Sequence, residues 1–156
     1  MKCMLPVNEV VELLWEEVLP IWQNILWPGR KSEIKQHSSM QYLGGYDMLV
    51  YNNPVHFWGF KSKSNEVLGV TSGFRSNKNL YRSRSIWLHP SLRGQNLTRQ
   101  LFAKTEEIAK NENCIGLWSF PRPSVLRSYL RFGFVQTSKL ITDFEFGPNC
   151  YVYKEL

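Results

Sequence analysis

The stretch from Leu88 to Phe102, LHPSLRGQNLTRQLF, constrains the fold of this chain more than any other part of the sequence. A short apolar run ends at Leu88, a turn with Pro90 and Gly94 follows, and helical periodicity begins at Leu97. We therefore expect a strand, a turn and a helix in succession. The first turn of a helix has about four unpaired backbone N–H groups and partial positive charge. Because no acidic residue stands in this first turn, the helix start predicts a binding site for an anion such as phosphate.

A parallel crossover is expected around this helix. Apolar residues keep helical spacing from Leu97 until Asn111 and Asn113, which are typical of a helix end. The segment Ile115–Phe120, IGLWSF, has the continuous apolar pattern of a strand in the middle of a sheet. A strand, a long helix and a second strand in this order predict a parallel pair of strands, since the helix supplies the crossover connection.

The last part of the chain is expected to hold a short helix and a closing hairpin. Ser124 is predicted to cap a helix over Val125–Phe132, and Gly133 stands where helices commonly end in glycine. The two predicted strands of the hairpin are Phe134–Phe146 and Tyr151–Glu155.

Upstream of the central stretch, the spacing of apolar residues changes to a period of two. Four short runs rich in β-branched and aromatic residues are separated by turns of Asn, Pro, Lys and Ser. Closely spaced strands with short turns predict an antiparallel meander, with a hairpin turn at 76–79. The four predicted strands are Met48–Tyr51, Val55–Lys61, Val67–Phe74 and Leu80–Leu88.

The N-terminal segment Val7–Trp27 has apolar residues spaced by three and four, which predicts one helix face. Asn8 is a candidate cap, and Pro20 predicts a kink or a split. Tryptophans on that face usually pack in the core; if they were exposed they would favour a ligand groove or a homodimer. The polar segment 30–47 predicts a loop or short-helix region, in which His37 is expected to be exposed.

Composition limits the class of protein. The chain has 156 residues, 43% hydrophobic and 14% aromatic, which predicts one stable domain over residues 1–156. Its 19 Lys and Arg against 13 Asp and Glu give a charge of +6, which is consistent either with an anionic partner or simply with a solvated basic surface. The three cysteines match neither a disulfide framework nor a zinc site, and no apolar run is long enough for a membrane span. We expect a cytoplasmic protein without bound metal or membrane attachment.

Two local motifs and the order of elements resemble the GNAT superfamily of N-acetyltransferases over nearly the whole chain. The first motif, LHPSLRGQNLT at 88–98, is similar to the family's pyrophosphate-binding turn. The second, SYLRFGF at 128–134, is similar to the family's tyrosine followed by Gly-Phe. The resemblance implies an α/β (α+β) fold, with a mixed, mostly antiparallel sheet of six to seven strands. It also implies a V-shaped splay between the central parallel strands, and about four flanking helices.

Acetyl-CoA is the anionic ligand and co-substrate that the resemblance implies. Its pyrophosphate would lie on the backbone of the turn, and its pantetheine arm would pair with main chain in the splay. Asn96 and Thr98 stand where the family usually has Gly and Gly or Ala; asparagine tolerates left-handed backbone angles, and the Thr98 hydroxyl could bind phosphate. Arg122 stands where many members have an asparagine that contacts the pantetheine arm. The implied cofactor-binding residues are Trp87, Leu88, Arg93, Gly94, Gln95, Asn96, Leu97 and Thr98.

The implied reaction is direct attack of a primary amine on the thioester, with the amine carried by a small molecule, peptide or protein. Tyr129 is the candidate general acid, because the resemblance places its hydroxyl near the sulfur; alternatively it only packs its helix on the sheet. Many members have a glutamate base on the central strands, but 81–88 contains no carboxylate. The base is therefore unassigned, with Asp143, Glu145 and a water relay as alternatives.

Two other classes of function remain as alternatives. One is a catalytically degenerate GNAT-like module that binds CoA or a protein partner, which the missing glycines and glutamate favour. The other is nucleic-acid binding, suggested by the net charge and by Arg82 and Arg84 among aromatic residues. Because alternating Arg and Ser on a strand more simply predicts one solvated face, we expect no nucleic-acid partner.

Overall fold

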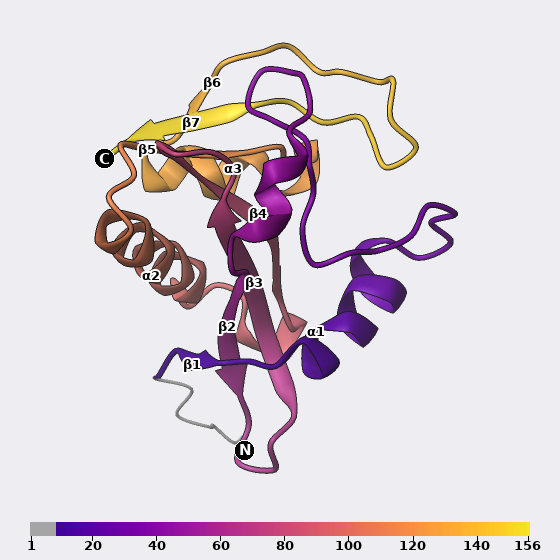
Figure 1. The fold of residues 1–156 in the computed structure, drawn as a ribbon. Coiled ribbons are helices and arrows are strands. Elements are labelled where there is room, and N and C mark those ends of the chain that lie inside the picture. The colour runs from indigo at the N-terminus through magenta and orange to yellow at the C-terminus, as the bar shows by residue number, and fades with distance from the viewer. Residues whose placement is uncertain (1–8) are drawn as a thin grey trace.

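The computed structural model describes residues 9–156; the predicted cap Asn8 lies outside them, as does Cys3. These residues form one mixed sheet of seven strands, which confirms the predicted class of fold. All neighbouring strands are antiparallel except β4 and β5, which are parallel. In sheet order the strands are β1 (Val11–Glu12), β2 (His56–Lys61), β3 (Val67–Arg75), β4 (Leu80–Leu88), β5 (Gly116–Ser119), β7 (Val152–Glu155) and β6 (Val135–Gln136) (Figure 1).

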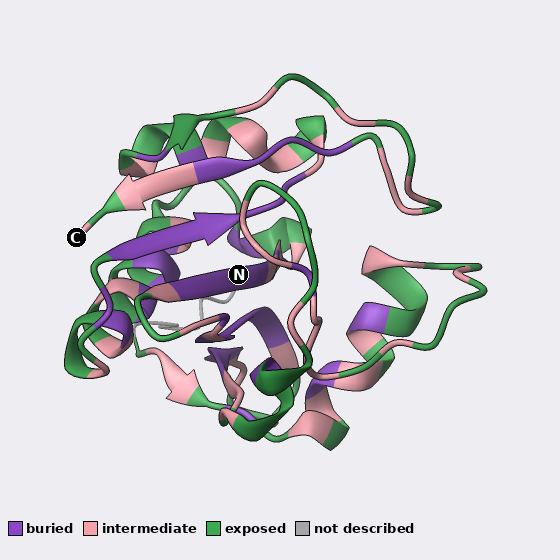
Figure 2. Ribbon diagram, turned by 45° about the horizontal axis from the view of Figure 1, so that its top comes forward, coloured by how far each residue is buried: buried purple, intermediate pink, exposed green. Residues whose placement is uncertain are grey.

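Helices cover both faces of this sheet. In the described part of the chain there are three α-helices, where about four helices were predicted: α1 (Trp15–Ile21), α2 (Leu97–Asn111) and α3 (Pro123–Phe132). α1 and α2 lie on opposite faces, and the central strands between them are the most deeply buried part of the molecule (Figures 1 and 2). Over residues 9–156, no helix combines the length and the apolar character needed to cross a bilayer.

The N-terminal helix starts later than its periodicity predicts. Val11 and Glu12 form an edge strand that pairs with β2, so the prediction of helical structure, single or broken, over residues 7–27 was wrong near its start. The helix begins after Leu14, whose N–H donates to the Glu17 carboxylate at 2.9 Å. Pro20 lies inside α1, and the chain then widens into a π-helical segment, η1 (Trp22–Leu26). A proline lacks the N–H that a regular helix needs, which accounts for the irregular continuation.

The tryptophans of this segment pack inward, as expected from their usual behaviour in helices. Trp22 is fully buried and its ring lies 5.2 Å from that of Trp15, 5.1 Å from that of Trp27 and 5.9 Å from that of Phe57. Such edge-to-face contacts favour a fixed geometry. Trp15 and Trp27 are half-buried, so no tryptophan of residues 15–27 is exposed.

The meander of β2, β3 and β4 has the predicted order and the predicted turn at 76–79. The Ser76 N–H donates to the Leu80 carbonyl at 2.9 Å and closes this hairpin. The predicted strand Met48–Tyr51 was wrong, because residues Met48–Asn52 form a 3-10 helix, η2. The Asp47 side chain accepts a hydrogen bond from the Leu49 N–H at its start, and an aspartate in this position favours a helical turn.

The connection from β4 through α2 to β5 is the predicted parallel crossover. β5 is buried along its whole length, and α3 follows it after Pro121. Ser124 is not the cap of α3: Arg122 occupies the cap position and Pro123 the first turn, so Ser124 already lies within the helix. Gly133 ends α3 with φ of 111°, the left-handed conformation expected of a C-terminal glycine.

The closing segment contains less strand than predicted. β6 has two residues and β7 four, and the chain between them forms a long loop over residues 137–151. An isolated bridge between Ile141 and Asn149 closes this loop. The Asn149 side chain donates to the Phe120 carbonyl at 2.8 Å, so the loop is attached to the end of β5 instead of extending the sheet.

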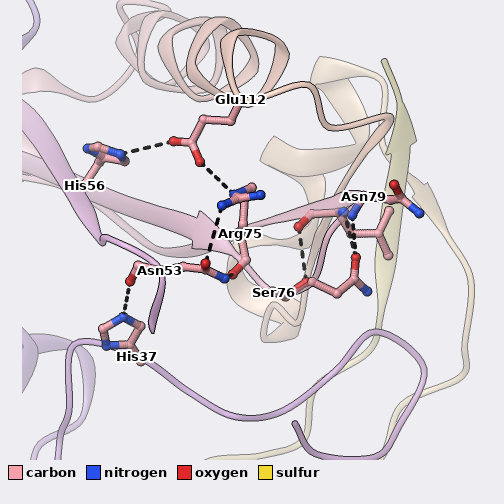
Figure 3. Close-up of polar contacts among 9 residues, drawn as sticks. His37, Asn53, His56, Arg75, Ser76, Asn79 and Glu112 are labelled. Atoms are coloured by element: carbon pink, nitrogen blue, oxygen red, sulfur yellow. Dashed lines mark hydrogen bonds and ion pairs between the residues drawn. The ribbon is translucent and has the colours of Figure 1, made fainter. Parts of the chain in front are cut away.

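The loop over residues 28–47 is held against the sheet by a chain of polar contacts (Figure 3). His37 Nε2 lies 2.6 Å from the Asn53 carbonyl oxygen, and the Asn53 side chain donates to the Arg75 carbonyl at 2.9 Å. The Arg75 guanidinium pairs with Glu112 at 3.2 Å, and His56 contacts the same carboxylate. His37 is thus half-buried against Tyr51 and Phe74, which corrects the prediction of an exposed histidine.

Candidate active site

The central parallel strands diverge part of the way along their length, which confirms the predicted splay. Pairing between β4 and β5 ends at Arg82 and Trp118. One residue further on, the Ser119 hydroxyl donates to the Ser83 carbonyl at 2.6 Å and spans the beginning of the gap. Beyond that point β4 is paired only with β3, so its other edge is open.

A β-bulge at Ser85 changes which side chains of β4 point to which face. Arg84 pairs with Ser72 and Ile86 with the adjacent Thr71, which leaves Ser85 as the extra residue, with φ of 67°. Side chains before the bulge, Arg82 and Arg84, therefore point to the α1 face. Those after it, Ile86 and Leu88, point to the α2 face, where they pack in the core around Leu101.

The backbone of Leu88 faces the open edge. His89 donates its N–H to the Leu68 carbonyl of β3 at 2.8 Å. Backbone groups alternate in direction along a strand, so those of Trp87 point to β3 and those of Leu88 point away from it. The Leu88 carbonyl already accepts a hydrogen bond from Arg93 Nε at 3.0 Å. Of the two predicted main-chain contacts, only Leu88 is positioned to pair with an added extended chain.

The turn before α2 has the geometry expected of an anion site. Gly94 and Asn96 both have left-handed backbone angles, with φ of 82° and 61°, so Asn96 adopts the left-handed conformation that asparagine was expected to tolerate here. The Asn96 side chain makes no capping hydrogen bond, and the first turn of α2 has no acidic residue. Leu97 is buried and fixes the helix start, whereas residues 93–96 are exposed. Arg93 donates its own N–H to the Pro90 carbonyl at 3.3 Å, so the backbone N–H groups that an anion could use begin at Gly94.

A cavity of about 160 Å³ passes through the sheet where β4 and β5 separate. Arg82 and Arg84 line it from the α1 face, and Ile86 and Tyr129 line it from the α2 face. The two long loops close its sides. The other lining residues are Leu26, Trp27, Arg30, Ser38, Met40, Ser85, Ser119, Phe120, Pro121, Arg122, Ser124, Val125, Phe146 and Asn149.

Tyr129 is buried at the α3 side of this cavity, with 2% of its surface exposed. Its hydroxyl lies 3.2 Å from that of Ser119, and its ring packs on Phe102 and Phe134. Burial raises the pKa of Tyr129, and the contact with Ser119 opposes part of that rise. The phenol is therefore protonated at neutral pH, as a proton donor must be.

Arg82 and Arg84 are buried, each with 6% of its surface exposed, which corrects the prediction of a solvated strand face. They cannot contact a polyanion lying on the surface, so nucleic-acid binding loses the residues that suggested it. Arg84 donates to the carbonyls of Lys35 and Gln36 at 2.7 and 3.0 Å and lies over Trp22 and Trp27. Burial, together with the neighbouring Arg82 charge, lowers the pKa of Arg84.

Arg82 differs from Arg84 in that two of its guanidinium nitrogens have no hydrogen-bond partner. Its guanidinium lies 4.8 Å from the centre of the Trp118 ring, and Nε and Nη1 are buried without a hydrogen-bond partner among residues 9–156. Burial lowers the pKa of Arg82 to about 10, so the group remains charged at neutral pH.

Two further arginines stand at the cavity. Arg122 donates to the Leu26 carbonyl, and Arg30 donates to the Ser32 hydroxyl at 2.8 Å and lies over Trp27. Arg122 therefore ties α3 to η1, which is a different role from that of the asparagine at this position in the family. No Asp, Glu or His is among the lining residues, so the cavity has a net positive charge and contains no candidate base.

The candidate bases on the closing loop are not at this cavity. The Glu145 carboxylate accepts hydrogen bonds from the N–H groups of Lys31 at 3.1 Å and Ser32 at 3.0 Å, so it links the two long loops. The contact with the Ser32 hydroxyl, followed by these backbone contacts, lowers the pKa of Glu145. Over residues 9–156, no three His, Cys, Asp or Glu side chains gather as a metal site would require.

Comparison with known proteins agrees with this geometry. Residues 11–134 match the acetyltransferase (GNAT) family. Because the match spans most of the chain, the protein belongs to this family of acetyltransferases. A search of curated proteins found no match.

Solved structures share the fold at low sequence identity. An acetyltransferase of the GNAT family from Staphylococcus aureus Mu50 has a TM-score of 0.67 at 16% identity, over 94% of this chain and 98% of the other. Ard1 from Thermoplasma volcanium has a TM-score of 0.57 at 16% identity, over 64% and 70%. The PaiA N-acetyltransferase from Thermoplasma acidophilum, solved in complex with coenzyme A, has a TM-score of 0.56 at 15% identity, over 69% and 65%.

Proposed function

We propose that this protein transfers the acetyl group of acetyl-CoA to a primary amine by direct attack. The observation that carries the proposal is the cavity through the sheet. It joins the open edge of β4, on the side of α2 and Tyr129, to a chamber on the side of α1 and the two long loops. A thioester and an amine that enter from opposite faces would meet at the splay.

The residues present fit acetyl-CoA. The uncapped start of α2, with Gly94 and Asn96 in left-handed conformation, suits a pyrophosphate. The outward backbone groups of Leu88 suit an extended pantetheine arm. Arg93 is held by the Leu88 carbonyl and so lies at the junction of these two regions.

Acetyl-CoA supplies an activated acyl carbon: the amine nitrogen forms a C–N bond to it, the C–S bond breaks, and the sulfur leaves with the electron pair. Tyr129 is proposed to donate its hydroxyl proton to that sulfur, because its phenol is buried at the splay and remains protonated. The amine must lose one proton. No carboxylate or imidazole lines the cavity, so this proton is expected to pass to solvent and, through solvent, to restore Tyr129. Nearby guanidinium charges favour a neutral amine, since like charges lower the pKa of an ammonium group.

Calorimetry with acetyl-CoA, followed by measurement of CoA thiol release with a panel of primary amines, tests this function. We expect binding at micromolar ligand and thiol release that depends on the amine. No binding at millimolar acetyl-CoA would refute the proposal. Binding without transfer to any amine would favour the alternative, a catalytically degenerate CoA-binding module.

A further inference from the structure

We propose that the acceptor amine carries a carboxylate beside its amino group and that Arg82 binds this carboxylate. The inference rests on the proposed acetyl transfer and identifies the class of acceptor: compact amino acids and close analogues, in preference to simple amines.

The main observation is the unsatisfied guanidinium of Arg82. Buried arginines are normally paired with an anion or hydrogen-bonded throughout, because an uncompensated buried charge is strongly unfavourable. Here Nε and Nη1 are buried without a hydrogen-bond partner among the described residues, and Arg82 lines the cavity. Nη2 is not among these enclosed atoms, so the Nη2 end of the guanidinium is the part available to a ligand inside the cavity.

The other cavity arginines are already engaged by the protein. Arg84 donates to two carbonyls of the 28–47 loop, Arg122 to a carbonyl of η1, and Arg30 to the Ser32 hydroxyl. Their charges still make the electrostatic potential in the cavity more positive, but their N–H groups are used to hold the loops in place. Arg82 is thus the binding residue, and the others position the chamber around it.

Charge balance favours an amine that also carries a carboxylate over a simple amine, which enters from neutral solution mainly as an ammonium ion. An ammonium ion entering a chamber with several guanidinium groups and no carboxylate would be repelled by all of them. A molecule that also carries a carboxylate compensates for Arg82 and remains neutral overall. A guanidinium matches a carboxylate well, since its planar donors can bind two oxygens at once.

Size argues for a compact acceptor. A cavity of about 160 Å³ is close to the roughly 150 Å³ that accommodates a molecule such as benzene. Arg82 and Tyr129 both line this space, so the carboxylate and the reacting nitrogen must be separated by only a few bonds. An α-amino acid meets this condition.

The experiment compares compact amino acids with their decarboxylated counterparts, such as alanine with ethylamine and valine with isobutylamine, by calorimetry on protein saturated with CoA. CoA has no acyl group, so binding is measured without turnover. The panel also contains phosphoethanolamine as a phosphate-bearing amine. We expect at least one amino acid to bind tenfold or more tightly than its counterpart. Equal or weaker binding of every amino acid would overturn the proposal, as would a clear preference for phosphoethanolamine.

Variants then test the assignment to Arg82. In Arg82→Met the preference for the carboxylate should fall to about one, while in Arg127→Met it should persist; Arg127 is exposed on α3 and its loss changes the net charge equally. Arg82→Lys keeps the charge and should retain part of the preference. Far-ultraviolet circular dichroism and CoA affinity confirm folding of each variant. A preference unchanged in Arg82→Met would overturn the role of this residue.

Transfer measurements separate this inference from the proposed function. Equal kcat/KM for both members of every pair would refute the inference and leave acetyl transfer intact. Arg82-dependent binding of amino acids without any transfer would refute the proposed function and leave the carboxylate site intact.

Discussion

Two regions of this protein suit anions, and they do so by opposite means. The turn before α2 is exposed over residues 93–96 and leads to the unpaired backbone N–H groups at the start of α2. The cavity at the splay is enclosed and offers guanidinium side chains, of which Arg82 is buried without a partner. The first kind of site is mainly local in sequence, whereas the second exists only when β4, η1 and the two long loops are brought together.

Because one region is exposed and the other is buried, they should respond differently to salt and to substitution. An exposed turn is screened by salt and tolerates changes of side chain that preserve its backbone angles. A buried guanidinium is little screened and depends on the identity of one side chain. Substitutions in the two regions should therefore affect different measurements.

The largest effect is expected within the enclosed region. Tyr129→Phe removes only the hydroxyl proposed as the proton donor, so kcat should fall on the order of 10²- to 10⁴-fold, the usual contribution of general acid catalysis. The acetyl-CoA dissociation constant should stay within about twofold, because the phosphate-binding turn is untouched. Tyr42→Phe is the matched control, since Tyr42 bonds to Thr137 away from the cavity lining. Unchanged turnover would remove Tyr129 from the acid role.

A smaller effect, on the other side of the comparison, is expected at the exposed turn. Thr98→Glu places a negative charge in the first turn of α2, where it repels a phosphate, and should weaken acetyl-CoA binding by about 10- to 100-fold. Ala103→Glu adds the same charge further along the exposed face of α2 and should have little effect. Calorimetry measures both. Equal affinities in the two variants would place the pyrophosphate elsewhere.

Backbone conformation, rather than side-chain chemistry, should determine the stability of this turn. Asn96→Gly should be tolerated, because glycine adopts φ near 61° freely. Asn96→Val should lower the free energy of unfolding by about 1–2 kcal/mol, since a branched side chain is strained there. Urea denaturation distinguishes them, and a valine variant as stable as the glycine variant would show that the turn is not constrained.

The smallest effect is expected at a partly exposed ion pair, which contrasts with the unpaired Arg82. The contact with Lys61, followed by that with the Leu14 N–H, lowers the pKa of Glu17 below 4.5. A lowered pKa contributes stability above the unfolded-state value, and this is lost as the pH falls through the folded-state value. Glu17→Gln should reduce the free energy of unfolding by about 0.5 kcal/mol at pH 7.

The difference between wild type and Glu17→Gln should disappear once the pH has fallen below the folded-state pKa of Glu17, where the carboxylate is protonated in both states. Urea denaturation at pH 7 and at a series of acidic pH values measures it. A difference that persists at low pH would show that the amide disturbs the helix start instead.

Much of the fold was predictable because it depends on local patterns. The crossover from β4 to β5 follows from a turn, a helical period and an apolar run, and Gly133 ends α3 as its type predicts. The errors lie where tertiary contacts override a pattern. Val11 and Glu12 have helical spacing but pair with the edge of β2, and Met48–Asn52 has strand composition but begins at a capping aspartate.

The candidate site divides in the same way. The turn with Gly94 and Asn96, and the place of Tyr129 at the splay, agree with the sequence motifs. The burial of Arg82 and Arg84 was not predicted, since Arg and Ser in alternation are typical of a strand with one solvated face. Loops 28–47 and 137–151 cover the face of the sheet on which Arg82 and Arg84 lie. These loops have no clear periodicity, so no local sequence pattern predicts that they bury the two arginines.

The bulge at Ser85 has a consequence for comparing this chain with its relatives. Because Ser85 is an extra residue in β4, the alternation of side chains between the two faces is interrupted there. Even-numbered residues before it point to the α1 face, and even-numbered residues after it point to the α2 face. An ungapped alignment to a relative without the bulge would place Arg82 and Arg84, which line the cavity, opposite residues that pack against α2 in the relative. Conservation of the two halves should therefore be counted separately, with the gap set at residue 85.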